Sequence, residues 1–164
     1  MMRFTKAGAI LVIALSLCAA ATSAHAFSFS GIGGKVGFLK PEDVDGTFVL
    51  SAHAEFEKHG SRVHLTPGVA YWSKDFVTDF NPNFDIYYHF KPEGTVTPFV
   101  GGGLGMHFYS FDGPIDGESD FGANIFGGVR FPGDRTHFFL EGRYAITDLG
   151  QLSILGGVTF HMGD

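Results

Sequence analysis

The segment 151–162, close to the carboxyl end of the chain, alternates between two kinds of residue with a period of two. This period is that of a β-strand, because successive side chains of a strand point to opposite faces of the sheet. One face of the segment is entirely apolar or glycine, whereas the other carries Ser153, Thr159 and His161. The segment is therefore predicted to be a strand with one fully apolar face. That face consists of Leu152, Ile154, Gly156, Val158, Phe160 and Met162.

Seven segments further upstream show the same two-faced alternation, and turn-forming residues separate them. In each segment one face is apolar or glycine, and the charged residues lie on the other face. We predict an all-β fold in which eight antiparallel strands close into an up-and-down barrel. The seven segments are 31–39, 48–56, 62–71, 84–90, 96–108, 121–131 and 137–146.

Short turns at 58–60, 91–94 and 132–135 alternate along the chain with polar loops, of which 73–81 and 112–120 are expected to be long. Outer-membrane barrels show this order, with both chain ends on the side of the short turns. The order therefore predicts a periplasmic side with the short turns and an external side with the loops.

Two places within the strands are expected to be irregular. Pro67 has no backbone N–H to donate to a neighbouring strand, so a bulge is predicted there. Phe27 and Phe29 are out of phase with the first strand, which either a bulge or a disordered amino-terminal tail would explain.

The first 26 residues have the features of a secretory signal peptide. Basic residues precede an apolar run at 7–21, and Ala24 and Ala26 supply the small residues that a signal peptidase recognises. A run of this length is short for a membrane-spanning helix. We predict a signal peptide at 1–26, cleaved after Ala26, and one barrel domain at 27–164.

The charge of the mature chain excludes one class of partner. Cleavage after Ala26 would remove Arg3 and Lys6 and leave nine basic against 17 acidic residues, a formal charge of −8. Nucleic acids bind to clustered positive charge, so no nucleic-acid partner is predicted. Cleavage also removes Cys18, the one cysteine of the sequence. The domain must therefore gain its stability from a large buried or lipid-covered apolar area.

Alternation alone leaves two kinds of barrel open, a membrane barrel with its apolar face outward and a soluble lipocalin-like carrier with its apolar face inward. The other face decides between them, because it is rich in glycine and histidine and lacks the many charges of a surface that meets water. Aromatic residues of the apolar face also gather near both strand ends, as membrane interfaces select. We therefore favour a transmembrane β-barrel with a narrow, filled lumen.

Four short motifs are similar to those of small outer-membrane β-barrel proteins, the porin-family-like group akin to the OmpA transmembrane domain and OmpX. The motifs are TPFVGGGLG at 97–105, FGGV at 126–129, LEGRY at 140–144 and GVTF at 157–160. The resemblance implies a monomer in the outer membrane of a Gram-negative bacterium, surrounded by outer-membrane lipid and lipopolysaccharide. It also implies that the barrel-assembly machinery recognises the carboxy-terminal strand. In one departure, the chain continues beyond Phe160, whereas such barrels usually end on an aromatic residue.

Seven charged residues of the non-apolar face are predicted to form a polar network in the lumen. Eight strands enclose just enough room for side chains, so a network of this kind fills the lumen by default. A narrow channel for small solutes or ions, gated by the network, is the alternative. The seven residues are Lys35, Glu55, Arg62, Asp85, Arg130, Glu141 and Arg143.

Six histidines share the same face and raise two hypotheses, a metal site and a pH-dependent switch. No tight spacing of metal ligands is present in the sequence. We therefore expect the histidines to pack and to form hydrogen bonds within the lumen, and we predict no metal and no cofactor. The six residues are His53, His64, His89, His107, His137 and His161.

Two further hypotheses concern surface chemistry. Acidic loops would hold divalent cations beside lipopolysaccharide phosphates. A lipid-modifying barrel enzyme would need a nucleophile beside a base, and His107 with Ser110 is the nearest pair. We predict no enzymatic activity and favour a structural or surface-interaction role. The acidic loop residues are Glu42, Asp43, Asp45, Asp75, Asp79, Asp112, Asp116, Glu118, Asp120 and Asp148.

Overall fold

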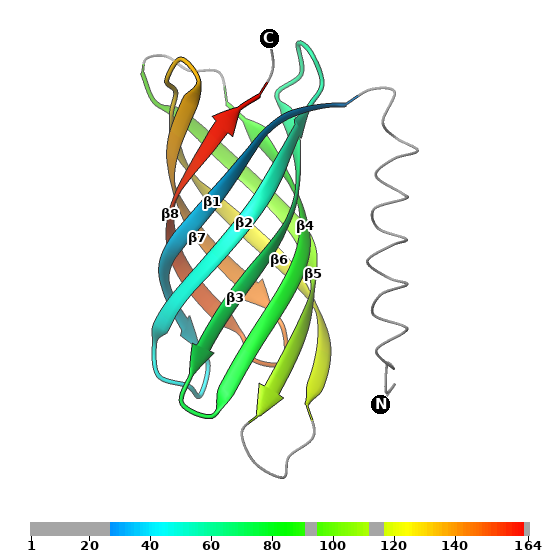
Figure 1. Cartoon of the computed structure of the whole chain (residues 1–164), viewed down its shortest axis with the longest axis vertical. Helices are drawn as coiled ribbons and strands as arrows, with labels where there is room; N and C mark the ends of the chain where they lie inside the picture. Colours follow the sequence, from blue (N-terminus) through cyan, green and yellow to red (C-terminus); the bar gives the residue numbers. More distant parts are fainter. Residues whose placement is uncertain (1–26, 91–94, 112–116, 163–164) are drawn as a thin grey trace.

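The computed structural model of the chain describes residues 27–90, 95–111 and 117–162. Within them the chain forms eight strands that pair in sequence order and close into one antiparallel barrel (Figure 1). The predicted fold class is confirmed, whereas the predicted signal peptide lies outside the described residues. The strands are β1 (Ser28–Pro41), β2 (Thr47–Glu57), β3 (Val63–Lys74), β4 (Val77–His89), β5 (Thr97–Phe111), β6 (Glu118–Phe131), β7 (Thr136–Ile146) and β8 (Gln151–His161).

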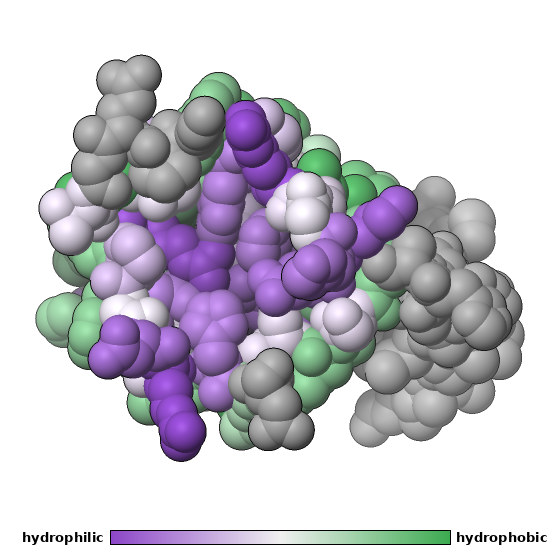
Figure 2. Space-filling model, turned by 90° about the horizontal axis from the view of Figure 1, so that it is seen from above, coloured by the Kyte–Doolittle hydropathy of each residue, from purple (hydrophilic) through white to green (hydrophobic). Residues whose placement is uncertain are grey.

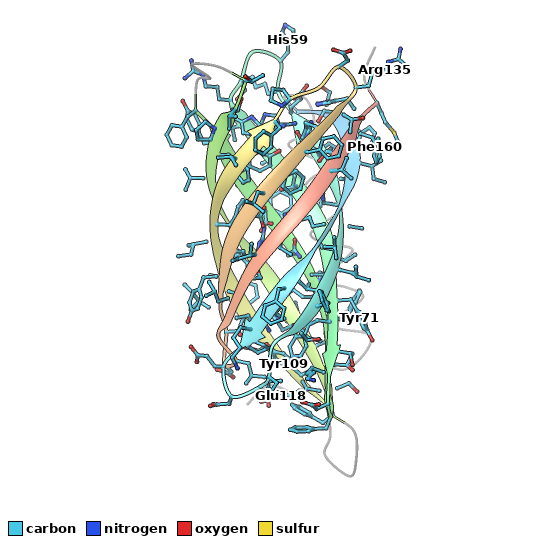
Figure 3. The ribbon with its side chains drawn as sticks, turned by 90° about the vertical axis from the view of Figure 1, so that its left-hand side faces the viewer. His59, Tyr71, Tyr109, Glu118, Arg135 and Phe160 are labelled. Carbon is cyan, nitrogen blue, oxygen red and sulfur yellow. The ribbon has the colours of Figure 1, made fainter. Side chains whose placement is uncertain are left out.

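The barrel has two ends that differ in what they carry. β1 begins and β8 finishes at the same end, where Gly31 pairs with His161, and we call this the terminal end. The opposite end, which carries the β1–β2, β3–β4, β5–β6 and β7–β8 connections, is called the loop end (Figure 1). In Figure 3, His59 and Arg135 lie at the terminal end, and Tyr109 and Glu118 lie near the loop end.

The outer face of the barrel is apolar, as the alternation predicts. Phe48 is 74% exposed, Ile154 63% and Ile125 57%, and exposed apolar side chains of this kind come from all eight strands. The view from the terminal end shows hydrophilic residues in the centre and hydrophobic residues at the rim (Figure 2). In the described residues, no helix is long and apolar enough to span a bilayer.

Glycines on the inner face leave room for the side chains that fill the lumen. A Cβ atom on Gly157 would collide with the ring of Phe139, and one on Gly128 would lie 2.8 Å from the ring of Phe99. The outward-facing Gly156, next to Gly157 in β8, would place its Cβ no closer than 4.0 Å to another group. The inner glycines are therefore required by packing inside a narrow barrel.

The strand register corrects one of the expected irregularities and explains the other. On either side of Pro67 the pairs His53–Gly68 and Phe56–Leu65 keep one register, so the predicted bulge is wrong. The ladder between β2 and β3 omits Pro67, which has no N–H to donate, and resumes unchanged. A register shift between Phe29 and Gly31 does occur in β1, and it accounts for the phase of Phe29.

The long loop predicted at 73–81 is also wrong. β3 continues to Lys74 and β4 begins at Val77, so Asp75 and Phe76 alone connect them. Asp75 has a φ of 52°, in the left-handed region that Asp and Asn tolerate in tight turns. Asp79 and Asn81 of the expected loop are instead residues of β4, and their side chains are buried inside the barrel.

Apolar side chains close the lumen at the loop end. Six buried residues from β1, β2, β3, β4, β5 and β8 pack into one cluster inside the barrel, which we call the apolar cap. The cap separates the polar interior from the loops. Its members are Leu39, Val49, Trp72, Val77, Tyr109 and Leu155.

Candidate functional site

Four of the charged residues predicted to line the lumen form an alternating chain of ion pairs across its middle. Lys35 Nζ lies 2.9 Å from Glu141 Oε2, and Arg143 Nε donates to Glu141 Oε1 at 2.8 Å. Arg143 also donates to Asp85 Oδ2 at 2.5 Å. The chain joins β1, β7 and β4, and each carboxylate is buried against at least one cation. These four residues, Lys35, Glu141, Arg143 and Asp85, are called the ion-pair chain.

Arg130 and Glu55 form a second charged pair, nearer the terminal end. Arg130 Nη2 lies 3.1 Å from Glu55 Oε1, and both side chains are buried. Histidines surround the pair: His64 Nδ1 lies 2.9 Å from the same Glu55 oxygen, and Arg130 donates to His89 and to His137. His161 at the mouth completes the group, with its Nε2 2.8 Å from Nδ1 of His137.

Arg62 does not join either group. It stands in the turn before β3, where it is exposed, and its guanidinium donates to the hydroxyl of Tyr88 at 3.2 Å. Tyr88 is itself exposed on the outer face. The alternation places Arg62 inward because it extends the strand by one residue, whereas β3 begins at Val63.

The structure adds a buried acid–base pair that the sequence pattern does not reveal. Asp79, predicted in a loop, lies in β4 with 1% exposure, and its Oδ2 is 2.7 Å from His107 Nδ1. Trp72 Nε1 and Gln151 Nε2 donate to the same oxygen at 3.0 and 3.3 Å. No Lys or Arg contacts Asp79 among the described ion pairs, so His107 is its cationic partner when protonated.

The acidic residues predicted to lie in loops divide into three groups. Glu42, Asp43 and Asp45 follow β1 at the loop end and are exposed, as are three others at that end. These six exposed residues are called the acidic rim. Asp112 and Asp116 lie outside the described residues. Asp79 is inside the barrel. The other three residues of the acidic rim are Asp75, Glu118 and Asp148, and Asp120 at the same end is half-buried.

One group in the described part of the chain has ligand atoms close enough to hold a metal ion. Glu55, Glu57 and His64 bring three such atoms within 4.8 Å of one another. The Arg130 guanidinium donates to the same Glu55 carboxylate and already supplies it with positive charge. A metal ion bound here would therefore compete with Arg130 for the Glu55 carboxylate, and a metal site at the histidines stays a hypothesis.

The pair considered for nucleophilic catalysis is not brought together. His107 is buried in the lumen with 2% exposure, whereas Ser110, three residues later in β5, is exposed. Strand positions that differ by an odd number, here three, lie on opposite faces of the barrel. A hydroxyl on the outside cannot reach a base on the inside.

No family model and no curated protein matches this sequence. Among solved structures, Neisserial surface protein A superimposes with a TM-score of 0.68 at 12% identity, over 82% of this chain and 97% of that one. The amino-terminal β-barrel domain of Pseudomonas aeruginosa OprF gives 0.61 at 16% identity, over 80% and 97%. The outer membrane enzyme PagL gives 0.51 at 14% identity, over 79% and 98%. The chain therefore has the fold of small outer-membrane barrels, and the predicted resemblance is confirmed at the level of fold.

Proposed function

We propose that this chain is an integral outer-membrane protein of a Gram-negative bacterium, exported with a cleaved signal peptide, which acts as a monomer in a structural or surface-interaction role. The outer face of the barrel carries this proposal, because large apolar side chains are exposed on every strand. Such a surface would drive aggregation in water, whereas bilayer hydrocarbon covers it. The likeness of fold to outer-membrane barrels supports the same location.

The contents of the lumen support a role that does not depend on transport. The apolar cap fills the loop end, and the ion-pair chain crosses the middle. Phe99 packs against Phe126 and Phe139, with ring centroids 6.5 and 6.4 Å apart, and these three rings are called the aromatic layer. Lys35 and Arg143 of the ion-pair chain lie over the rings of this layer. Eight strands leave little space beyond such side chains.

The loop end supplies the surface through which the protein would act. With the chain ends in the periplasm, as is usual for these barrels, the loop end faces outward and exposes the acidic rim. Carboxylates of this kind hold divalent cations, and those cations bind lipopolysaccharide phosphates. Lipopolysaccharide is therefore the proposed neighbour of the rim, and the assembly machinery the proposed partner of β8.

Two alternatives each have one supporting observation. The ion-pair chain borders a small polar cavity, which favours a narrow channel. A conductance that is measurable in planar bilayers, and that changes when Glu141 is replaced by alanine, would support a channel.

The likeness of fold to PagL favours a lipid-modifying enzyme, although His107 and Ser110 lie on opposite faces of the barrel. Altered lipid A in mass spectra of cells that express the protein would support it.

The membrane location is tested by fluorescence quenching from labelled lipid. The mature chain has no cysteine, so Ile125→Cys and Ser153→Cys each offer one labelling site, the first outward and the second inside the barrel. We expect lipid-borne quenchers to reduce the fluorescence of a probe at 125 and not at 153. A probe at 125 that meets water would overturn the proposal in favour of a soluble carrier. The second expected result is that the protein, extracted from outer membranes, migrates differently on gels before and after heating.

A further inference from the structure

Six buried side-chain atoms in the described residues have no hydrogen-bond partner in the protein, and all six belong to residues that line one cavity. Unpaired buried polar atoms are uncommon in folded proteins, so six at one place need a common cause. Three of the six belong to Asp79, His107 and Asp85, whose other polar atoms form ion pairs already described. The atoms are His53 Nδ1, Asp79 Oδ1, Asn81 Nδ2, Asp85 Oδ1, His107 Nε2 and Asn124 Nδ2.

The cavity lies in the loop-end half of the lumen, between the apolar cap and the ion-pair chain. Leu39, Trp72 and Leu155 of the cap line it on one side, and Lys35 and Arg143 line it on the other. Its volume is about 50 Å³. Since one water needs roughly 10–15 Å³ of cavity volume measured in this way, the cavity has room for about three or four waters.

The unpaired atoms of Asp79 and His107 belong to residues whose other polar side-chain atom is already bonded within the lumen. Oδ2 of Asp79 receives three donors while its Oδ1 receives none, and His107 uses Nδ1 on Asp79 while its Nε2 is unpaired. Asn124 is 4% exposed, and its amide nitrogen has no partner in the protein. The set contains acceptors on carboxylates and donors on amides, which is the mixture that water satisfies.

We propose that this cavity binds a cluster of about three or four ordered waters, which joins the Asp79–His107 pair to Asp85 of the ion-pair chain. Charged ligands fit the lining less well. A cation would face Lys35 and Arg143, and an anion would face Asp79 and Asp85. Organic solutes are larger than the space. Water is neutral and small, and it can donate and accept hydrogen bonds, so it can bond to both the unpaired donors and the unpaired acceptors of the lining.

The cluster would be isolated from bulk solvent on both sides. The apolar cap covers it toward the loop end, and the aromatic layer lies beyond the ion-pair chain toward the terminal end. Waters held in this way exchange slowly compared with surface waters. Long residence is what makes them detectable by magnetic resonance.

The first test detects the waters in the unmodified mature barrel, folded in detergent micelles. Magnetisation transfer from water is expected to reach the side-chain amide of Asn124, and a long-lived water is expected to give a negative cross-relaxation rate. The backbone amide of Phe99, which does not line the cavity, is the control and should show no transfer. Absence of transfer at Asn124 would overturn the proposal.

The second test depends on the sign of a stability change. Leu has nearly the shape of Asn, so Asn124→Leu removes the amide and keeps the volume. In a hydrated cavity the substitution removes the amide that bonds to the waters, and the unfolding midpoint should shift to a lower urea concentration. In a dry cavity it removes an unpaired buried amide, and the midpoint should shift to higher urea, which would refute the proposal. Should the variant fail to fold, the resonance measurement on the unmodified chain still decides.

Discussion

Glu141 has a central place in the charge balance of the lumen. It is 2% exposed, and it bonds to Lys35 on one side and to Arg143 on the other. Arg143 has a second carboxylate in Asp85, whereas the described ion pairs give Lys35 no partner but Glu141. A residue with these contacts stabilises the barrel by preventing a buried, uncompensated charge.

Replacing Glu141 alone should therefore be costly. We expect Glu141→Leu to lower the free energy of unfolding by about 3–5 kcal/mol, because Lys35 is left buried and unpaired. The double variant Lys35→Met with Glu141→Leu removes both charges and should be more stable than the single variant. Urea unfolding followed by the fluorescence of Trp72, the one tryptophan of the chain, measures both.

An exposed ion pair supplies the control for this comparison. Lys74 lies 3.6 Å from Asp75 at the loop end, and both side chains are at least a third exposed. Lys74→Gln should change the free energy of unfolding by less than about 1 kcal/mol. A Glu141→Leu variant as stable as Lys74→Gln would show that the buried chain contributes no more than a surface pair.

At the scale of the strand, β8 shows how neighbouring glycines can have different roles. Gly157 faces the lumen, where the Phe139 ring occupies the space of a side chain. Gly156 faces outward, and a Cβ there would meet Val36 O at 4.0 Å, an ordinary contact. The two residues share one strand and adjacent positions, so they form a matched pair.

Alanine at these two positions should have different consequences for the stability of the barrel. Gly157→Ala is expected to destabilise the barrel by about 1–3 kcal/mol, because the Phe139 ring must leave its position in a packed lumen. Gly156→Ala should be neutral within about 0.5 kcal/mol. Unfolding midpoints of the two variants check this, and equal shifts would mean that the ring moves aside without cost.

The strands also explain why some of the lumen was predictable from the sequence and some was not. Alternation identifies which residues face inward, so Lys35, Glu141 and Arg143 were found from their parity alone. It fails where polar residues continue a strand past its apolar part, as Asp79 does in β4, because they look like a loop. The side-chain partners cannot be read from one strand at all, since the Asp79–His107 bond depends on the register between β4 and β5.

The whole molecule is a polar interior inside an apolar cylinder, the reverse of a soluble domain. Carboxylates, histidines and amides are buried within the lumen, while Leu50, Ile86 and Leu140 are about half exposed on the outside. The free energy of folding in water is therefore a poor guide to this molecule, because its outer face gains stability only when lipid covers it.

The loss of stability caused by an arginine on the outer face should depend on how deep in the bilayer the residue lies. Ile125 lies near the middle of β6 and Ile146 at the loop-end limit of β7, and they are 57% and 53% exposed. Arginine is expected to lower the free energy of unfolding in lipid vesicles by about 2–4 kcal/mol at 125 and by about 0–1 kcal/mol at 146. The two sites are matched in exposure, so the difference between them comes from depth. If both arginine variants were as stable as the parent barrel in vesicles, the outer face would not be in contact with hydrocarbon.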